Sequence, residues 1–174
     1  QKGIKKKITI KLNDKVLCAK KRKGHFEGVL AVINRFLQKI PAKYIFLGEK
    51  DFQQAYLIKK YLQKEFNTKI IICNTVRNRN YLPLSSRNEL LDKKEILKLE
   101  KISKIIFNFK HEILKDFNNI NLLNIYKNKI SLLCDKIEYF EIRNQKDLSK
   151  NISIKNFRIF IAYKQNEVRL IDNI

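Results

Sequence analysis

Short apolar runs alternate with amphipathic stretches through the first part of the chain. Residues 44–47 and 69–73 are nearly continuous apolar runs, which are typical of strands buried in a parallel sheet. Apolar residues recur at helical spacing over about residues 51–66 between these runs, and over residues 25–40 before them. The resulting strand–helix–strand unit favours a parallel sheet with helical cover. Strict alternation over residues 8–12 predicts one further strand near the start.

The pattern changes after Val76. Residues 77–83 are polar and irregular, as in a linker or a binding loop. Asp92 and Glu95 have the spacing of a capping box, which predicts the start of a long helix. The remainder is expected to form a helix over 122–134 and strands over 137–142, 157–163 and 168–171. The sequence therefore predicts an α/β fold, with an α/β part over residues 1–75 and an α+β part over residues 76–174.

Charge changes this picture little. The 174 residues include 38 Lys and Arg against 17 Asp and Glu, which gives a net charge of +21. The basic residues are spread along the chain, and the two tight clusters, at residues 5–7 and 20–23, lack the aromatic ladder of single-strand binders. We interpret them as solvated faces and expect no specific nucleic-acid partner. No apolar run approaches the roughly 20 residues of a membrane span, and no secretory signal is recognisable, so a soluble, cytoplasmic protein is expected.

The thiol and imidazole groups do not suggest a metal site. Cys18, Cys73 and Cys134 are far apart and odd in number, and His25 and His111 stand alone. Reduced, buried thiols are expected, and no bound metal. The chain starts at Gln1 and contains no Met, which indicates either a fragment or methionines missing from the written sequence.

Residues 48–51, Gly-Glu-Lys-Asp, follow the predicted strand 44–47 and precede a helix. Ligands of open α/β sheets bind at the carboxyl ends of strands, and helix N-termini attract phosphate. Gly48 would allow a ligand close to the backbone, Lys50 would meet phosphate, and Asp51 would accept from ribose hydroxyls. The alternative is an ordinary tight turn with Asp51 as an N-cap.

Residues 84–88, Leu-Ser-Ser-Arg-Asn, offer two hydroxyls and a guanidinium at a helix start. Such donors form a phosphate cradle. The alternative is that Ser86 and Glu89 form a capping box without any ligand.

Two polar positions near predicted helix starts are weaker candidates. Gln54 lies one turn beyond Asp51, so both side chains can face one crevice, although a surface glutamine is the alternative. Arg22 and His25 flank Gly24, and His25 has no carboxylate at a fixed spacing to support a role as a catalytic base.

Taken together, these segments resemble those of the pantothenate synthetases. Residues 22–29 (R-K-G-H-F-E-G-V) resemble the family's R-P-G-H-F-x-G-V, and residues 46–54 (F-L-G-E-K-D-F-Q-Q) resemble F-G-E-K-D-x-Q-Q. Residues 75–77 followed by 84–88 resemble T-V-R-E-x-D-G-L-A-M-S-S-R-N, and residues 169–173 match the closing R-L-I-D-N. Order and spacing agree from about residue 16 to the end.

The resemblance implies the second half of a Rossmann-like nucleotidyl-transferase domain, followed by a small α+β lid domain. It implies an ATP-dependent ligase that condenses pantoate with β-alanine to pantothenate through a pantoyl-adenylate, with Mg²⁺ carried by the nucleotide. Its partners would be these small molecules, and it allows a homodimer. By similarity, ATP would contact Gly48, Glu49, Lys50, Asp51, Val76, Leu84, Ser85, Ser86 and Arg87. Catalytic roles fall to Lys50, Ser85, Ser86 and Arg87, pantoate binding to Gln54, and a further phosphate contact to Arg22.

Departures from the family pattern limit what the chain is expected to do alone. Tyr81, Pro83 and Lys23 stand where the family has Gly, Ala and Pro, and the first two are expected to stiffen the loop before the serine pair. The family's upstream H-x-G-H motif and first pantoate-binding Gln are not in this sequence, so the chain alone is expected to be inactive. A binding-only paralogue, and a basic RNA-binding module, are the alternative functions.

Overall fold

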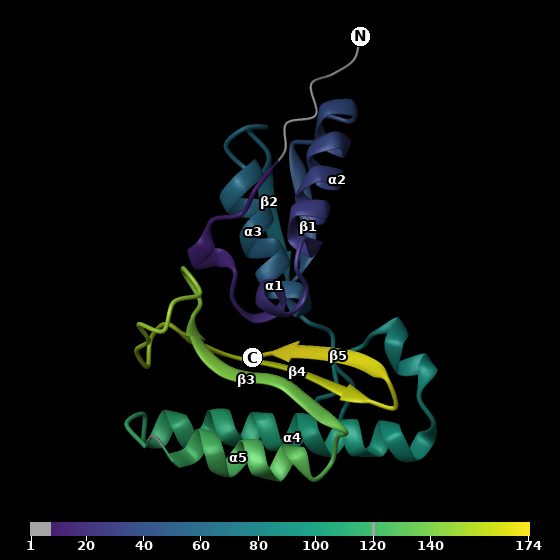
Figure 1. The fold of residues 1–174 in the computed structure, drawn as a ribbon, viewed down its shortest axis with the longest axis vertical. Helices are drawn as coiled ribbons and strands as arrows, with labels where there is room; N and C mark the ends of the chain where they lie inside the picture. Colours follow the sequence, from purple (N-terminus) through teal and green to yellow (C-terminus); the bar gives the residue numbers. More distant parts are fainter. Residues whose placement is uncertain (1–7, 120) are drawn as a thin grey trace. The chain divides into compact units, whose positions relative to one another are not determined.

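A computed structural model describes residues 8–119 and 121–174 of the chain (Figure 1). The chain divides into two compact units, Gln1–Asn74 and Thr75–Ile174. Each unit has its own sheet, parallel in the first and antiparallel in the second.

The first unit is built around the strand–helix–strand motif that the sequence predicts. Its elements are the 3-10 helix η1 (Leu12–Asp14), α1 (Leu17–Lys21), α2 (His25–Lys39), β1 (Tyr44–Gly48), the 3-10 helix η2 (Glu49–Asp51), α3 (Phe52–Leu62) and β2 (Lys69–Cys73). Strands β1 and β2 pair in parallel, from Tyr44 opposite Lys69 to Gly48 opposite Cys73. The parallel pair and its connecting helix are confirmed.

The predicted strand over residues 8–12 is wrong. Residues 8–11 have no regular structure, and η1 begins at Leu12. The backbone N–H of Lys11 donates to the hydroxyl of Tyr61 at 2.7 Å instead of to a neighbouring strand. Ile10 is buried all the same. The alternation of apolar and polar residues here therefore reflects the burial of one side chain and not a strand. The short helix α1 had no sequence prediction.

The expected burial of the parallel strands is also wrong. Tyr44 and Phe46 of β1 are 45% and 67% exposed. On α2, a stripe of Val32, Phe36 and Ile40 is 54%, 57% and 68% exposed. Parallel strands in complete domains are covered on both faces, and the two-stranded sheet of this unit leaves large apolar side chains open to solvent.

The second unit places two helices against a three-stranded antiparallel sheet. Its elements are the 3-10 helix η3 (Ser86–Leu90), α4 (Lys93–Lys115), α5 (Asn121–Ser131), β3 (Lys136–Asn144), β4 (Phe157–Gln165) and β5 (Val168–Asn173). The strand order is β3-β4-β5, and α4 and α5 run side by side along the sheet (Figure 1). All three strands and both helices predicted from the sequence are present.

The capping box that the sequence predicts starts α4. Asp92 Oδ1 accepts from the backbone of Glu95 at 2.8 Å, and Glu95 Oε2 accepts from the backbone of Asp92 at 2.9 Å. One face of α4 then fills the core, with the ring of Phe109 at 5.1 Å from the rings of both Tyr126 and Phe140. The second unit therefore has a packed core of its own, to which the segment before α4 is joined.

Surface chemistry agrees only in part with expectation. Cys18 is buried and Cys134 partly buried, but Cys73, the last residue of β2, is exposed. Burial raises the pKa of the Cys134 thiol.

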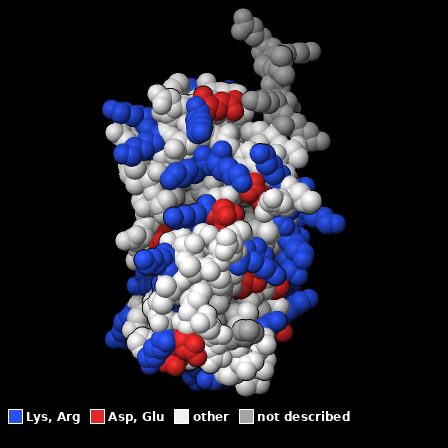
Figure 2. Space-filling view, turned by 90° about the vertical axis from the view of Figure 1, so that its left-hand side faces the viewer, with Lys and Arg blue, Asp and Glu red and all other residues white. Residues whose placement is uncertain are grey.

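Lys and Arg side chains are spread over the face in Figure 2, with Asp and Glu among them. The exposed cluster at residues 20–23 closes α1, and the cluster at residues 5–7 lies outside the described residues. In the described part of the chain, no helix has the length and apolar character needed to cross a bilayer.

Candidate functional site

The carboxyl end of β1 carries the first group of candidates. β1 ends at Gly48, η2 holds Glu49 to Asp51, and α3 starts at Phe52. A Cβ atom at Gly48 would meet no heavy atom within 4 Å, and the φ of Gly48 is −70°. Neither packing nor backbone conformation in the described residues therefore demands glycine, which leaves room for a ligand to approach the chain.

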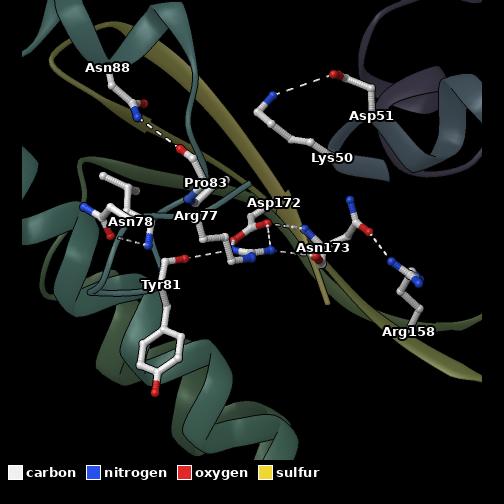
Figure 3. Close-up of polar contacts among 11 residues, drawn as sticks. Lys50, Asp51, Arg77, Asn78, Tyr81, Pro83, Asn88, Arg158, Asp172 and Asn173 are labelled. Atoms are coloured by element: carbon white, nitrogen blue, oxygen red, sulfur yellow. Dashed lines mark hydrogen bonds and ion pairs between the residues drawn. The ribbon is translucent and has the colours of Figure 1, made fainter. Parts of the chain in front are cut away.

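Lys50 and Asp51 lie together at this turn (Figure 3). Lys50 Nζ is 3.8 Å from Asp51 Oδ2, and the two side chains are 17% and 49% exposed. Asp51 occupies the N-cap position of α3, but its side chain accepts no capping hydrogen bond. Capping therefore does not account for an aspartate here. A mostly covered ammonium beside a half-exposed carboxylate can bind phosphate and a hydroxyl.

The two glutamines that follow have different environments. Gln53 is buried, and its Nε2 donates to the carbonyl oxygen of Val16 at 2.8 Å. Gln54 is half-buried, on the turn of α3 next to Asp51. Gln53 thus ties the segment before α1 to α3, whereas Gln54 keeps the accessibility that the substrate role predicted for it requires.

Sequence reasoning missed a buried cluster centred on Asp14. Asp14 is 1% exposed and accepts hydrogen bonds from Lys60 Nζ at 2.7 Å and from the Tyr61 hydroxyl at 2.6 Å. Burial works to lower the pKa of Lys60, but hydrogen bonds to Asp14 and Tyr56 outweigh it and raise that pKa above its usual range. Burial, reinforced by the bond to Asp14, raises the pKa of Tyr61. A single aspartate in a polar stretch gave no sequence signal for this cluster.

Arg22 and His25 contact each other at the start of α2. Arg22 Nη1 lies 2.7 Å from His25 Nε2. Because a guanidinium can only donate, Nε2 of His25 acts as the acceptor and carries no proton in this arrangement. Arg22 is exposed, so this pair gives His25 a cationic neighbour.

In the second unit, the loop over residues 77–83 forms a closed turn. Arg77 and Pro83 form an isolated antiparallel bridge, and the backbone N–H of Leu84 donates to the carbonyl oxygen of Val76 at 3.0 Å. This brings Val76 and Leu84 side by side, with 67% and 56% of their surfaces exposed. Two candidate residues eight positions apart thus lie on one edge of the turn.

The serine pair starts a short 3-10 helix. Ser85 is the N-cap residue of η3, and its Oγ accepts from the backbone N–H of Arg87 at 3.3 Å. The alternative capping box of Ser86 and Glu89 is therefore wrong, because the cap lies one residue earlier. Ser86 and Arg87 are exposed, so their hydroxyl and guanidinium are accessible to a ligand.

Tyr81 adopts the left-handed backbone conformation, with φ of 69°. This is the conformation that glycine tolerates best, and the resembled family has glycine here. The Tyr81 ring packs on Phe107 with centroids 4.5 Å apart. On the other side of the turn, the buried Pro83 accepts a hydrogen bond from Asn88 Nδ2 at 3.0 Å. The mobility of this loop stays a prediction.

Each unit brings its own candidates together. Residues 48–51 and Gln54 gather at one end of β1, and Val76 lies beside Leu84 and the start of η3. Within the described residues, no three His, Cys, Asp or Glu side chains converge as metal ligands. The arrangement offers phosphate and hydroxyl contacts.

Comparison with known proteins identifies the family of this chain. A family model described as pantoate-beta-alanine ligase matches residues 3–174. The pantothenate synthetase of Francisella tularensis subsp. novicida (strain U112) is 40% identical over 161 residues, which are 91% of this chain and 53% of that protein. The chain thus spans about half the length of the curated relatives it matches.

Solved structures agree with this assignment. The pantoate-beta-alanine ligase of Francisella tularensis, complexed with beta-gamma ATP and beta-alanine, is 40% identical with a TM-score of 0.74, over 96% of this chain and 57% of that one. The pantothenate synthetase of Thermus thermophilus has the same fold, with a TM-score of 0.85 over 99% of this chain and 64% of that one, at 22% identity. The expected α/β fold class is confirmed, and the chain belongs to the pantoate-beta-alanine ligase family.

Proposed function

We propose that this chain carries part of the active site of an ATP-dependent ligase that joins pantoate to β-alanine. The reaction has two steps. The pantoate carboxylate attacks the α-phosphorus of ATP, which forms pantoyl-adenylate and releases pyrophosphate. The amine of β-alanine then attacks the acyl carbon, the acyl–phosphate bond breaks, and AMP leaves.

The first unit would hold the nucleotide and pantoate. Gly48 and Glu49 line the ATP site, Lys50 contacts the phosphates, Asp51 contacts the ribose, and Gln54 pairs a pantoate hydroxyl. The open space at Gly48 and the limited exposure of Lys50 support this role. Arg22, exposed at the end of α1 and shortly before α2, supplies a further positive charge to the phosphates.

The second unit would act as the lid. Val76 contacts adenine through its backbone, and Leu84, Ser85, Ser86 and Arg87 surround the triphosphate. Adenylation builds negative charge on the α-phosphate and the leaving pyrophosphate, so fixed donors there lower the barrier. The exposure of Ser86 and Arg87 at the start of η3 supports this assignment.

Mg²⁺ would arrive on the nucleotide and neutralise phosphate charge. Its ligands would be phosphate oxygens and water, which Mg²⁺ commonly retains at nucleotide sites. The enzyme would work in the cytoplasm on small molecules and could assemble as a homodimer. The chain covers 53% of a relative's length, so these 174 residues alone would bind nucleotide weakly and turn over none.

One observation carries the proposal. The relative that was crystallised with beta-gamma ATP and beta-alanine is 40% identical to this chain over 96% of its length. The candidate residues of this chain offer the phosphate and hydroxyl contacts that such ligands need, which supports the proposal.

Replacement of Lys50 tests the proposal. In the protein with the family's upstream part restored, Lys50→Ala should cost about 2–3 kcal/mol of transition-state stabilisation, the scale for one preorganised charged contact. The measurement is kcat/KM for pantoate-dependent pyrophosphate release from ATP. Lys59→Ala, which removes an exposed lysine from the same unit, is the matched control and should change little. An unchanged kcat/KM in Lys50→Ala would remove Lys50 from the site.

A further inference from the structure

The end of β5 holds the start of the loop over residues 77–83. Arg77 Nη1 donates to Asp172 Oδ2 at 2.8 Å, and Arg77 Nη2 donates to Asp172 Oδ1 at 2.7 Å. Nη2 also donates to the carbonyl oxygen of Asn173 at 3.0 Å, and Nη1 to that of Tyr81 at 2.8 Å. One guanidinium, at the start of the turn, therefore contacts both β5 and Tyr81 inside the turn (Figure 3).

The pair is well shielded from solvent. The Arg77 and Asp172 side chains are 15% and 5% exposed, and the guanidinium carbon lies 5.1 Å from the centre of the Phe107 ring. A buried ion pair contributes little net stability, because desolvation of both charges offsets their attraction. Its two parallel hydrogen bonds nevertheless fix the direction of the arginine strongly. Orientation is thus the better physical reason for the pair.

The orientation of Arg77 is passed to the serine pair through short backbone steps. Arg77 bridges Pro83, and the neighbouring Val76 accepts from the N–H of Leu84 at 3.0 Å. Pro83 in turn accepts from Asn88 Nδ2 at 3.0 Å, which anchors η3. A shift of Arg77 would therefore move Leu84 and the start of η3 together.

We propose that the Arg77–Asp172 ion pair is a positioning device for the phosphate-binding segment Leu84 to Arg87. Neither residue contacts the nucleotide in this scheme. Together they position the backbone of the segment that carries Ser85, Ser86 and Arg87. The proposal rests on the function proposed above and adds two residues to its machinery.

Asp172→Asn tests the local part, because it keeps the shape of the side chain and removes its charge. Hydrogen exchange of the 174-residue chain should become about tenfold faster at the amides of Asn78 and Leu84, which close the turn, while amides of α4 keep their rates. Glu138→Gln is the control. It removes the charge of a carboxylate that pairs with Arg169 at 2.9 Å in the same sheet, with side chains 15% and 19% exposed.

ATP titration of the same proteins tests the functional part. Asp172→Asn should weaken ATP binding about tenfold, the effect of losing charge-assisted hydrogen bonds that fix a site. Glu138→Gln should match the wild type. Equal exchange at Asn78 and Leu84 in the two variants would overturn the proposal, and so would faster exchange with unchanged ATP affinity. Absence of ATP binding by the wild-type chain would instead contradict the nucleotide role on which the proposal depends.

Discussion

Tyr81 occupies a backbone conformation that disfavours its own side chain. A non-glycine residue in the left-handed region costs about 1–2 kcal/mol relative to the right-handed one. The cost is offset by the contact of the Tyr81 ring with Phe107 at 4.5 Å and by the hydrogen bond that the Tyr81 carbonyl accepts from Arg77. The turn thus keeps a glycine-like conformation and replaces the freedom of glycine with a packed ring.

This balance predicts that glycine at position 81 is more stable than alanine, the reverse of their usual order at most positions. Tyr81→Ala should destabilise the second unit by about 1–2 kcal/mol, because it loses the aromatic contact and keeps the strained backbone. Tyr81→Gly loses the same contact but relieves strain, so it should be roughly 1 kcal/mol more stable than the alanine variant. Denaturant unfolding of both variants measures the difference. A more stable alanine variant would contradict the left-handed conformation of Tyr81.

The neighbouring residues Gln53 and Gln54 are expected to have different roles, one in stability and one in substrate binding. Gln54→Leu should raise the pantoate KM while ATP affinity and thermal stability stay near wild type, since only a contact to substrate is lost. Gln53→Leu should do the opposite, because it breaks the buried hydrogen bond to Val16 and so lowers the melting temperature. Steady-state kinetics of the upstream-restored protein and thermal unfolding of both variants provide the comparison. If Gln54→Leu reduced ATP binding and left the pantoate KM unchanged, Gln54 would belong to the nucleotide site.

At the scale of elements, α3 is held by the Asp14 cluster as well as by its apolar face. Asp14 belongs to η1, and its carboxylate binds Lys60 and Tyr61 near the end of α3. Gln53 adds a bond from the first turn of α3 to Val16. The segment before α1 is therefore fastened at both ends of the helix whose start forms the proposed nucleotide site.

Asp14→Asn should destabilise the first unit by about 1.5–3 kcal/mol, the range for hydrogen bonds to a charged group, with the lower end favoured because Lys60 is partly exposed. The pKa values of Lys60 and Tyr61 are raised in the folded protein. Groups with raised folded pKa values contribute stability that is complete below their unfolded values and is lost as the pH rises through the folded ones. The difference between wild type and variant should therefore be flat from about pH 6 to 9 and shrink above about pH 10. Urea unfolding across this range checks it, and a difference that grows above about pH 10 would contradict it.

The spacing of apolar residues correctly predicted the elements whose signals all lie within the element itself. The long apolar stripe and the capping pair Asp92 and Glu95 located α4, because both signals are local. The five-residue alternation at 8–12 misled, since the Lys11 backbone pairs with the Tyr61 side chain 50 residues away. The cap of η3 was misplaced by one residue because two serines are adjacent and either could serve. Local sequence patterns thus predicted secondary structure correctly where no contact to a distant residue replaced the local hydrogen bonds.

At the scale of the whole molecule, the candidate site residues could be predicted from the sequence. The residues that hold them in position through contacts from distant parts of the chain could not. Residues 48–51 and 84–88 were recognisable as motifs at strand and helix boundaries. Arg77 and Asp172 are 95 residues apart, and nothing in their local sequence indicates that they meet. Charge complementarity between distant positions becomes visible only when the fold brings them together.

Exposed apolar residues in the first unit indicate incomplete cover. Phe46 on β1 and Phe36 on α2 are 67% and 57% exposed. Two parallel strands are marginal by themselves, and an uncovered sheet edge is prone to pair with other chains. The chain also spans 53% of a relative's length. We therefore expect the first unit to be more stable when the family's upstream part is joined to it.

The last prediction concerns the activity of the 174 residues by themselves. The 174-residue chain should form no AMP above background from pantoate, β-alanine and ATP, because adenylation needs donors on both sides of the triphosphate. Positioning and electrostatic stabilisation act jointly, so one side of a site keeps far less than half of the rate enhancement. Restoring the family's upstream part with its H-x-G-H motif should produce turnover and raise the melting temperature. The same restored protein with both motif histidines changed to alanine is the control, which should regain stability without activity. Turnover by the short chain at the rate of the restored protein would show that the chemistry resides within these residues.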